Sequence, residues 1–217
     1  METTGLTKEW SERGKPVAAH PKRLGLHESR MPSSRQDETK VERFLASRHL
    51  VAERLPRSIG PEEPEKPDFQ VLGRNGELLF CEVKSIFAQT PLEGILHRTI
   101  CNGLTVKFHK AAAQCRTVNS HHFVPNVLAW VSHNVQINVH TFRDLLRGHI
   151  RIDTQIIADL TPYRFGRLRA DLPEIDLHVW LEEDDTPHWI IVNSSRPEFV
   201  TLLTRLFGID RQNVEPV

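Results

Sequence analysis

The sequence predicts an α/β fold, on the strength of three observations. Two short apolar segments, 69–72 and 78–85, flank the dipeptide Asn75-Gly76, which is a strong tight-turn signal and indicates a β-hairpin. Apolar residues over 104–115 recur at helical spacing and define one face of a helix. Residues 126–131 are apolar nearly throughout, which is typical of a buried strand. With a helix before the hairpin, this order is that of an α/β unit.

The segment before the hairpin divides into a tail, a helix and a loop. Residues 1–36 carry sparse, aperiodic apolar side chains among Gly, Pro, Ser and charges, so we expect a disordered tail. Helical spacing of apolar residues predicts a short amphipathic helix over 38–49. Residues 50–55 either complete that helix or form a strand, and Pro56 ends either one. Residues 60–67 hold three prolines and four charges, which predicts a loop.

The C-terminal third is predicted to extend the same domain. Its expected elements are a short helix over 141–147, a strand over 150–160, two hairpin strands over 175–181 and 189–192 that turn at 184–187, and a last helix from Ser195 to Gly208. The order Ser-Arg-Pro-Glu from Ser195 matches a capping box, and Gly208 favours the end of a helix. We therefore expect a core over 37–135 and an α/β extension over 136–217.

Composition excludes several classes of protein. The 217 residues are 39% hydrophobic, with 28 Lys and Arg against 28 Asp and Glu, which is the balance of an ordinary globular protein. Three cysteines without a C-x-x-C spacing fit neither a disulfide framework nor a zinc ribbon. The longest apolar run, 127–131, is far too short to span a membrane. Since residues 1–20 also lack the apolar stretch of a signal peptide, we expect an intracellular, cytoplasmic protein.

The segment 78–85 carries an unusual pair of charges for a strand. Its side chains alternate, so Glu82 and Lys84 share one face with Leu78 and Phe80. Both faces of this strand begin with apolar residues, which predicts a central strand that is covered on both sides. An acid and a base at the end of such a strand must be paired, bound to a metal or placed at a cleft.

Asp68 lies at the start of the partner strand, where the hairpin would bring it beside Glu82. Two carboxylates that converge in a cleft favour a hard divalent cation, which prefers oxygen ligands, and magnesium is the natural choice. A lysine beside such an ion can orient the attacking water and offset charge that develops on a phosphorus centre. This combination indicates hydrolysis of phosphodiester bonds.

The sequence Pro67-Asp68, thirteen intervening residues and then Glu82-Val83-Lys84 resembles the signature of the PD-(D/E)XK nuclease superfamily. That resemblance covers about 100 of the 217 residues and implies a restriction-endonuclease-like core, which runs helix, three-strand meander, helix, strand. The Holliday-junction-resolvase-like branch is the most similar. In that branch a glutamate of the first helix joins the metal site and a serine follows the lysine, positions that Glu42 and Ser85 occupy here.

The resemblance implies a divalent-metal-dependent endonuclease that acts on DNA. Asp68, Glu82, Glu42 and the Val83 carbonyl would bind magnesium, with manganese as an alternative ion, and Lys84 would orient the water. Glu53 competes with Glu42 if the first helix runs on to residue 55. Two other readings remain open: a catalytically inactive module of the same fold that binds nucleic acid or assembles with partners, and an enzyme that cleaves RNA at the same site.

Two further groups of residues are candidates for contact with nucleic acid. Lys107, Lys110 and Gln114 share a helix face distinct from the apolar one, although a solvated polar face has the same pattern. Arg164, Arg167 and Arg169 alternate with aromatic residues, which suits contact with phosphates and stacking on bases, or equally a basic loop that packs its aromatic side chain into the core. We expect nucleic acid, above all DNA, as the partner, and a homodimer is compatible with the sequence.

Overall fold

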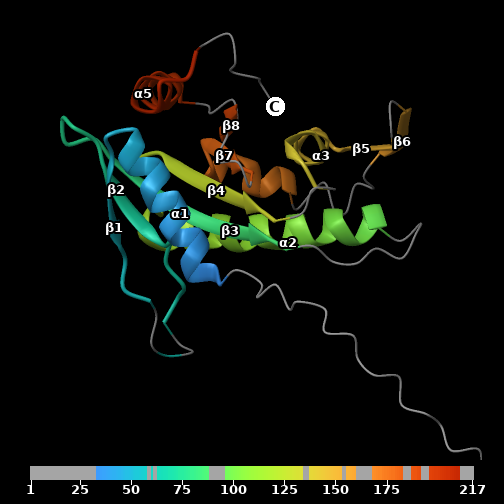
Figure 1. Ribbon diagram of the computed structural model, residues 1–217, viewed down its shortest axis with the longest axis horizontal. Coiled ribbons are helices and arrows are strands. Elements are labelled where there is room, and N and C mark those ends of the chain that lie inside the picture. The colour runs from blue at the N-terminus through green and yellow to red at the C-terminus, as the bar shows by residue number, and fades with distance from the viewer. Residues whose placement is uncertain are drawn as a thin grey trace, which may run out of the picture. The chain divides into compact units, whose positions relative to one another are not determined.

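A six-stranded sheet organises the described part of the chain (Figure 1). The computed structural model describes residues 33–57, 60, 63–87, 96–133, 137–152, 155–159, 168–182, 187–191 and 196–210. All of them belong to the unit Pro32–Val217. Most of the predicted tail therefore lies outside the described residues, but residues 34–36 belong to the first helix and correct the boundary of that tail.

The strands of this sheet follow the spatial order β1-β2-β3-β4-β7-β8. They are β1 (Val51–Arg54), β2 (Phe69–Leu72), β3 (Leu78–Ile86), β4 (Asn126–Ser132), β7 (Leu177–Leu181) and β8 (Pro187–Ile191). Successive pairs are antiparallel from β1 to β3, parallel from β3 through β4 to β7, and antiparallel again between β7 and β8. The predicted three-strand meander is thus confirmed, and β3 is a central strand.

Helices cover both faces of the sheet. The helices are α1 (Ser34–Ser47), α2 (Leu96–Val118), α3 (Val139–Leu146) and α5 (Pro197–Phe207), with a short 3-10 turn η1 (Leu172–Glu174). One buried cluster joins α1 and α5 to Leu79, Cys81 and Val83 of β3. A second cluster joins α2 and α3 to Trp130 and Trp180 on the opposite face. No described helix is long and apolar enough to cross a membrane.

The first helix begins four residues before the predicted start. Gln36 accepts a hydrogen bond from the Ser33 N–H at 2.7 Å, which satisfies one of the free donors at the start of α1. The helix ends at Ser47, and His49 takes a positive φ of 61° before the chain enters β1. Residues 51–54 therefore form a strand, which settles the ambiguity that the sequence left over 50–55.

Gly76 closes the β2–β3 hairpin with a φ of 82°. An L-residue in that conformation is strained, so we expect Gly76→Ala to lower the free energy of unfolding by about 1 kcal/mol. Gly103→Ala, on the exposed side of α2, is the matched control. Ala has a higher helix propensity than Gly, and its methyl group would meet open space at this position. Urea unfolding of both variants checks this, and equal effects would contradict a conformational cause.

Beyond β4 the structure corrects two predictions. The single strand predicted over 150–160 is a separate hairpin of β5 (His149–Ile152) and β6 (Gln155–Asp159). The last helix begins at Pro197 rather than at Ser195, and Arg196 makes no side-chain cap; the Ser195 of the predicted capping box lies outside the described residues. Pro at the first helical position needs no N–H partner and can start the helix without a cap. The predicted end of that helix at Gly208 is confirmed by its φ of 64°.

Candidate active site

The candidate site lies toward the carboxyl ends of the parallel strands β3 and β4. Glu82 and Lys84 project from β3, opposite Leu128 and Trp130 of β4 in the parallel register. Their side chains face α2, because Leu128 and Trp130 belong to the core cluster on that side. The carboxyl end of parallel strands is the usual place for a ligand site in an open α/β sheet.

The hairpin brings Asp68 beside Glu82. Phe69 pairs with Cys81 in the antiparallel register, so the preceding Asp68 lies opposite Glu82. The Asp68 N–H donates to Glu82 Oε2 at 3.0 Å, and the Val83 N–H donates to Asp68 Oδ2 at 2.9 Å. These reciprocal bonds hold the two carboxyl groups side by side, as the hairpin register predicted.

Burial dominates the electrostatics of this acid pair. The side chain of Glu82 is only 2% exposed, and burial raises its pKa to about 8 although the Lys84 ammonium acts in the opposite direction. The charge of Asp68 contributes to that rise. Burial likewise raises the pKa of Asp68, partly offset by the Val83 N–H, while Glu38 adds to the rise. Ionisation of Glu82 therefore carries a desolvation cost in the folded protein.

Lys84 connects the acid pair to α2. Its Nζ donates to Glu82 Oε1 and to Gln114 Oε1, the latter at 2.7 Å. Gln114 Nε2 in turn donates to the Lys66 carbonyl at 3.0 Å, which ties α2 to the segment that leads into Asp68. The Lys84 ammonium group is therefore oriented by two acceptors, and Gln114 is connected to the acid pair through Lys84.

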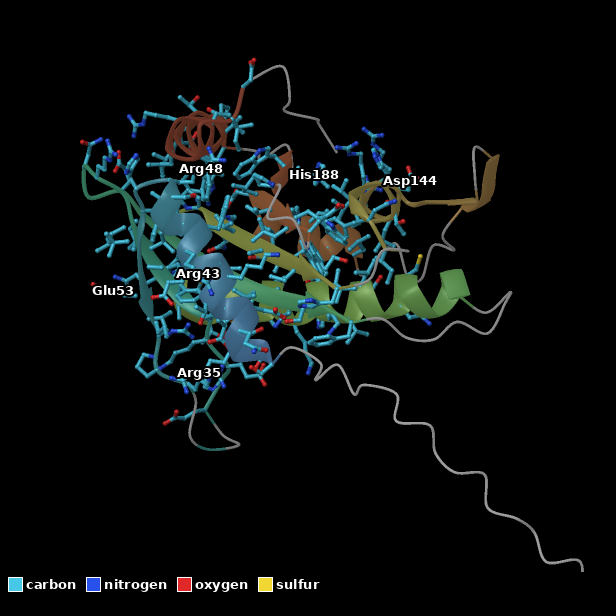
Figure 2. The ribbon with its side chains drawn as sticks, viewed as in Figure 1. Arg35, Arg43, Arg48, Glu53, Asp144 and His188 are labelled. Atoms are coloured by element: carbon cyan, nitrogen blue, oxygen red, sulfur yellow. The ribbon has the colours of Figure 1, made fainter. Side chains whose placement is uncertain are left out.

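The structure pairs Glu42 with a cation outside the acid pair. Glu42 Oε2 accepts from Arg54 Nη2 at 3.1 Å, and its side chain is 44% exposed. The carboxylate of α1 whose charge acts on Asp68 is instead Glu38, one turn earlier and buried. Glu53 lies on β1 with an exposed side chain, at the outer edge of the sheet in Figure 2. Glu38 is not among the site residues that the sequence predicted.

Ser85 points to the opposite face of β3 from Lys84. Its hydroxyl donates to Asp37 Oδ2, and His133 Nε2 contacts Asp37 Oδ1 at 2.8 Å. Asp37 is buried, so this cluster fastens α1 to the ends of β3 and β4. Ser85 is thereby separated from the acid pair by the sheet itself.

The other predicted contacts with nucleic acid are distributed unevenly. Burial lowers the pKa of Lys107, and the positive charges of Lys84 and Lys110 lower it further. Lys107 therefore lies near Lys84. Lys110 is exposed on the same helix. Arg169 is exposed in a short helical segment before η1. Arg164 and Arg167 lie outside the described residues.

The donor set of the site suits a hydrated divalent ion. Among the described residues, no group of three or more His, Cys, Asp or Glu side chains could hold a metal by itself. Asp68 and Glu82 would supply two carboxylates, and the Val83 carbonyl is the third ligand that the resemblance implies. Magnesium usually takes one or two carboxylates from a protein and keeps water or phosphate oxygens in its other positions. The two converging carboxyl groups therefore fit such an ion.

Comparison of the sequence with models of known protein families finds no match. Comparison with curated proteins likewise finds none.

Proposed function

We propose that this protein is a divalent-metal-dependent nuclease that hydrolyses phosphodiester bonds in DNA. The observation that carries the proposal is the pair formed by the buried Glu82 and the half-buried Asp68, with the Lys84 ammonium fixed beside it at the end of a central strand. Two adjacent acids, of which the buried Glu82 is costly to ionise, have little structural benefit by themselves. A cation between them removes that cost, and the adjoining lysine supplies the charge that phosphodiester hydrolysis needs.

The order α1, β1 to β3, α2, β4 supports a restriction-endonuclease-like core as the finer description of this fold. The resemblance of the sequence to the PD-(D/E)XK signature depends on the same residues that converge in space. Both support magnesium as the cofactor, with manganese as the alternative ion.

Each residue of the site has a distinct part in the proposed reaction. Asp68 and Glu82 would hold the ion, which when bound supplies Lewis acidity and lowers the pKa of water. Lys84 can orient the attacking water and stabilise negative charge on the phosphate in the transition state. Gln114 positions the Lys84 ammonium. Lys107, close to Lys84, is placed to attract the substrate backbone.

The direct test is incubation of the purified protein with plasmid, linear, single-stranded and branched DNA. We expect cleavage with magnesium or manganese and no cleavage with a chelator, because the carboxyl pair cannot activate water without a cation. Gel electrophoresis of each substrate over time is the measurement. RNA of the same sequence is included as a second substrate.

Each outcome of that test has a defined meaning. Cleavage of RNA alone would replace DNA in the proposal and leave the catalytic residues in place. Binding of nucleic acid without cleavage in either metal would contradict the enzyme and support the inactive module instead. Cleavage that persists in the chelator would contradict the metal dependence.

A further inference from the structure

A basic cavity adjoins the acid pair on the side of α1. It has a volume of about 310 Å³, and its polar lining consists of Arg35, Glu38, Arg54, Arg57, Lys66 and Asp68. Four cationic side chains thus face two carboxyl groups, and Asp68 belongs both to this cavity and to the candidate active site. The cavity is therefore a cationic surface that continues directly from the proposed reaction centre.

The buried carboxylate of Glu38 organises two of these cations. Arg54 Nη1 donates to Glu38 Oε2, and Arg57 Nη2 donates to Glu38 Oε1. Arg54 also lies over the Phe69 ring, with its Cζ 5.1 Å from the ring centroid. A guanidinium group has five N–H donors in a fixed plane, so donors remain for a ligand after these contacts. Glu38 and Phe69 thereby preorganise a pair of arginines at the cavity.

The remaining two cations have no comparable partner. Among the described residues, the side chains of Arg35 and Lys66 form no hydrogen bond or ion pair. Only the backbone carbonyls of these two residues accept hydrogen bonds from other side chains. Arg35 lies at the start of α1, as Figure 2 shows, and its side chain lines the cavity. The four cations face Glu38 and Asp68, and Glu42 is a third carboxylate that pairs with Arg54, so one positive charge remains in excess and an anion would complete the balance.

We propose that this cavity binds a phosphate group of the substrate strand next to the bond that is cleaved. Phosphate is the anion that suits a set of arginine forks and a lysine point charge, and every nucleic acid strand carries it at regular spacing. The shared wall at Asp68 places such a phosphate beside the acid pair. This inference rests on the proposed function and specifies how the substrate is held at its site.

The test measures binding without cleavage. Arg35→Gln combined with Lys66→Gln removes two cations that hold no internal contact among the described residues, so the fold should persist. Fluorescence anisotropy in a chelator follows a short single-stranded DNA labelled at its 3′ end, with either a 5′-phosphate or a 5′-hydroxyl. We expect about a tenfold or greater loss of affinity and a salt slope lower by about 1 to 1.5, since each contact with a single strand contributes about 0.7.

A double variant with the same charge change is the control. Arg43 is exposed farther along α1, as labelled in Figure 2, and Arg74 is exposed in the β2–β3 turn; neither lines the cavity. Arg43→Gln with Arg74→Gln should weaken binding by less than about threefold. Equal losses in the two double variants would overturn the cavity as a phosphate site.

The two forms of the DNA distinguish the source of the phosphate. A loss confined to the 5′-phosphorylated strand would assign the cavity to a terminal phosphate, and a similar loss with both strands would assign it to an internal phosphodiester. If the wild-type protein fails to bind either strand, the inference is wrong. Because binding is read in the chelator, a failure of metal-dependent cleavage would overturn the proposed nuclease activity separately.

Discussion

Replacement of Lys84 by Met is expected to lower the rate of metal-dependent cleavage by a hundredfold or more. Loss of one preorganised charge at a developing anion costs about 3 kcal/mol of transition-state stabilisation or more. The expected loss is large because the Lys84 ammonium is held by both Glu82 and Gln114. Glu82→Gln should have an effect of the same size, since it removes one of the two carboxylates that would hold the ion.

Lys110→Met removes a cation of α2 that is predicted to contact nucleic acid but makes no contact with the acid pair among the described interactions, so it separates attraction of the substrate from the role of Lys84. Initial rates at saturating magnesium for the three variants are the measurement, with thermal unfolding to verify that each is folded. Wild-type rates in Lys84→Met would exclude the assigned role of this lysine. A similar loss in Lys110→Met would point to general electrostatic attraction of the substrate.

The central part of the site could be predicted because its signals are local. The Asn75-Gly76 turn sets the register of the hairpin, and that register places Asp68 opposite Glu82. Alternation along β3 then assigns Glu82 and Lys84 to one face. Both steps depend on short-range geometry, which a single sequence carries well.

Which glutamate of α1 lies near Asp68 could not be predicted in the same way. Glu38 and Glu42 are four residues apart on α1, so they share a face and differ only by one turn along the axis. The choice depends on where the helix begins, and the helix starts at Ser34 rather than near residue 38. Because Glu38 is thereby set in the second turn, it is buried near Asp68, whereas Glu42 pairs with Arg54 at the surface.

The basic cavity depends on contacts that are distant in sequence. Arg54 is the last residue of β1, Arg57 follows that strand, Lys66 precedes β2, and Arg35 lies on α1. No spacing in the sequence links these segments; the meander and the packing of α1 bring them together. The same limit explains the β5–β6 hairpin, because Asp153 and Thr154, which separate the two strands in the sequence, supply no Gly or Pro turn signal.

In the metal-free protein, Glu82→Gln is expected to increase stability above neutral pH while it removes activity. The pKa of Glu82 is about 8 in the folded protein against 4.5 ordinarily, so the folded state binds the proton more tightly than the unfolded state. Wild-type stability is therefore greatest below about pH 4.5 on this account and falls as pH rises to about 8. A glutamine does not titrate, so its variant lacks that loss, and we expect it to be more stable by about 2 to 4 kcal/mol at pH 8.

Urea unfolding in a chelator from pH 5 to pH 9 measures the difference between the two proteins. The buried His178, whose pKa is lowered to about 3 by burial, destabilises both equally as the pH falls below 6.5, and so cancels from the comparison. If the pH profiles of the two proteins are parallel, ionisation of the buried Glu82 does not lower the stability of the folded protein. Magnesium at pH 8 should then stabilise the wild type and leave Glu82→Gln unchanged, because an ion that binds only the folded state stabilises it by mass action. Equal stabilisation of both proteins would place the ion elsewhere than at Glu82.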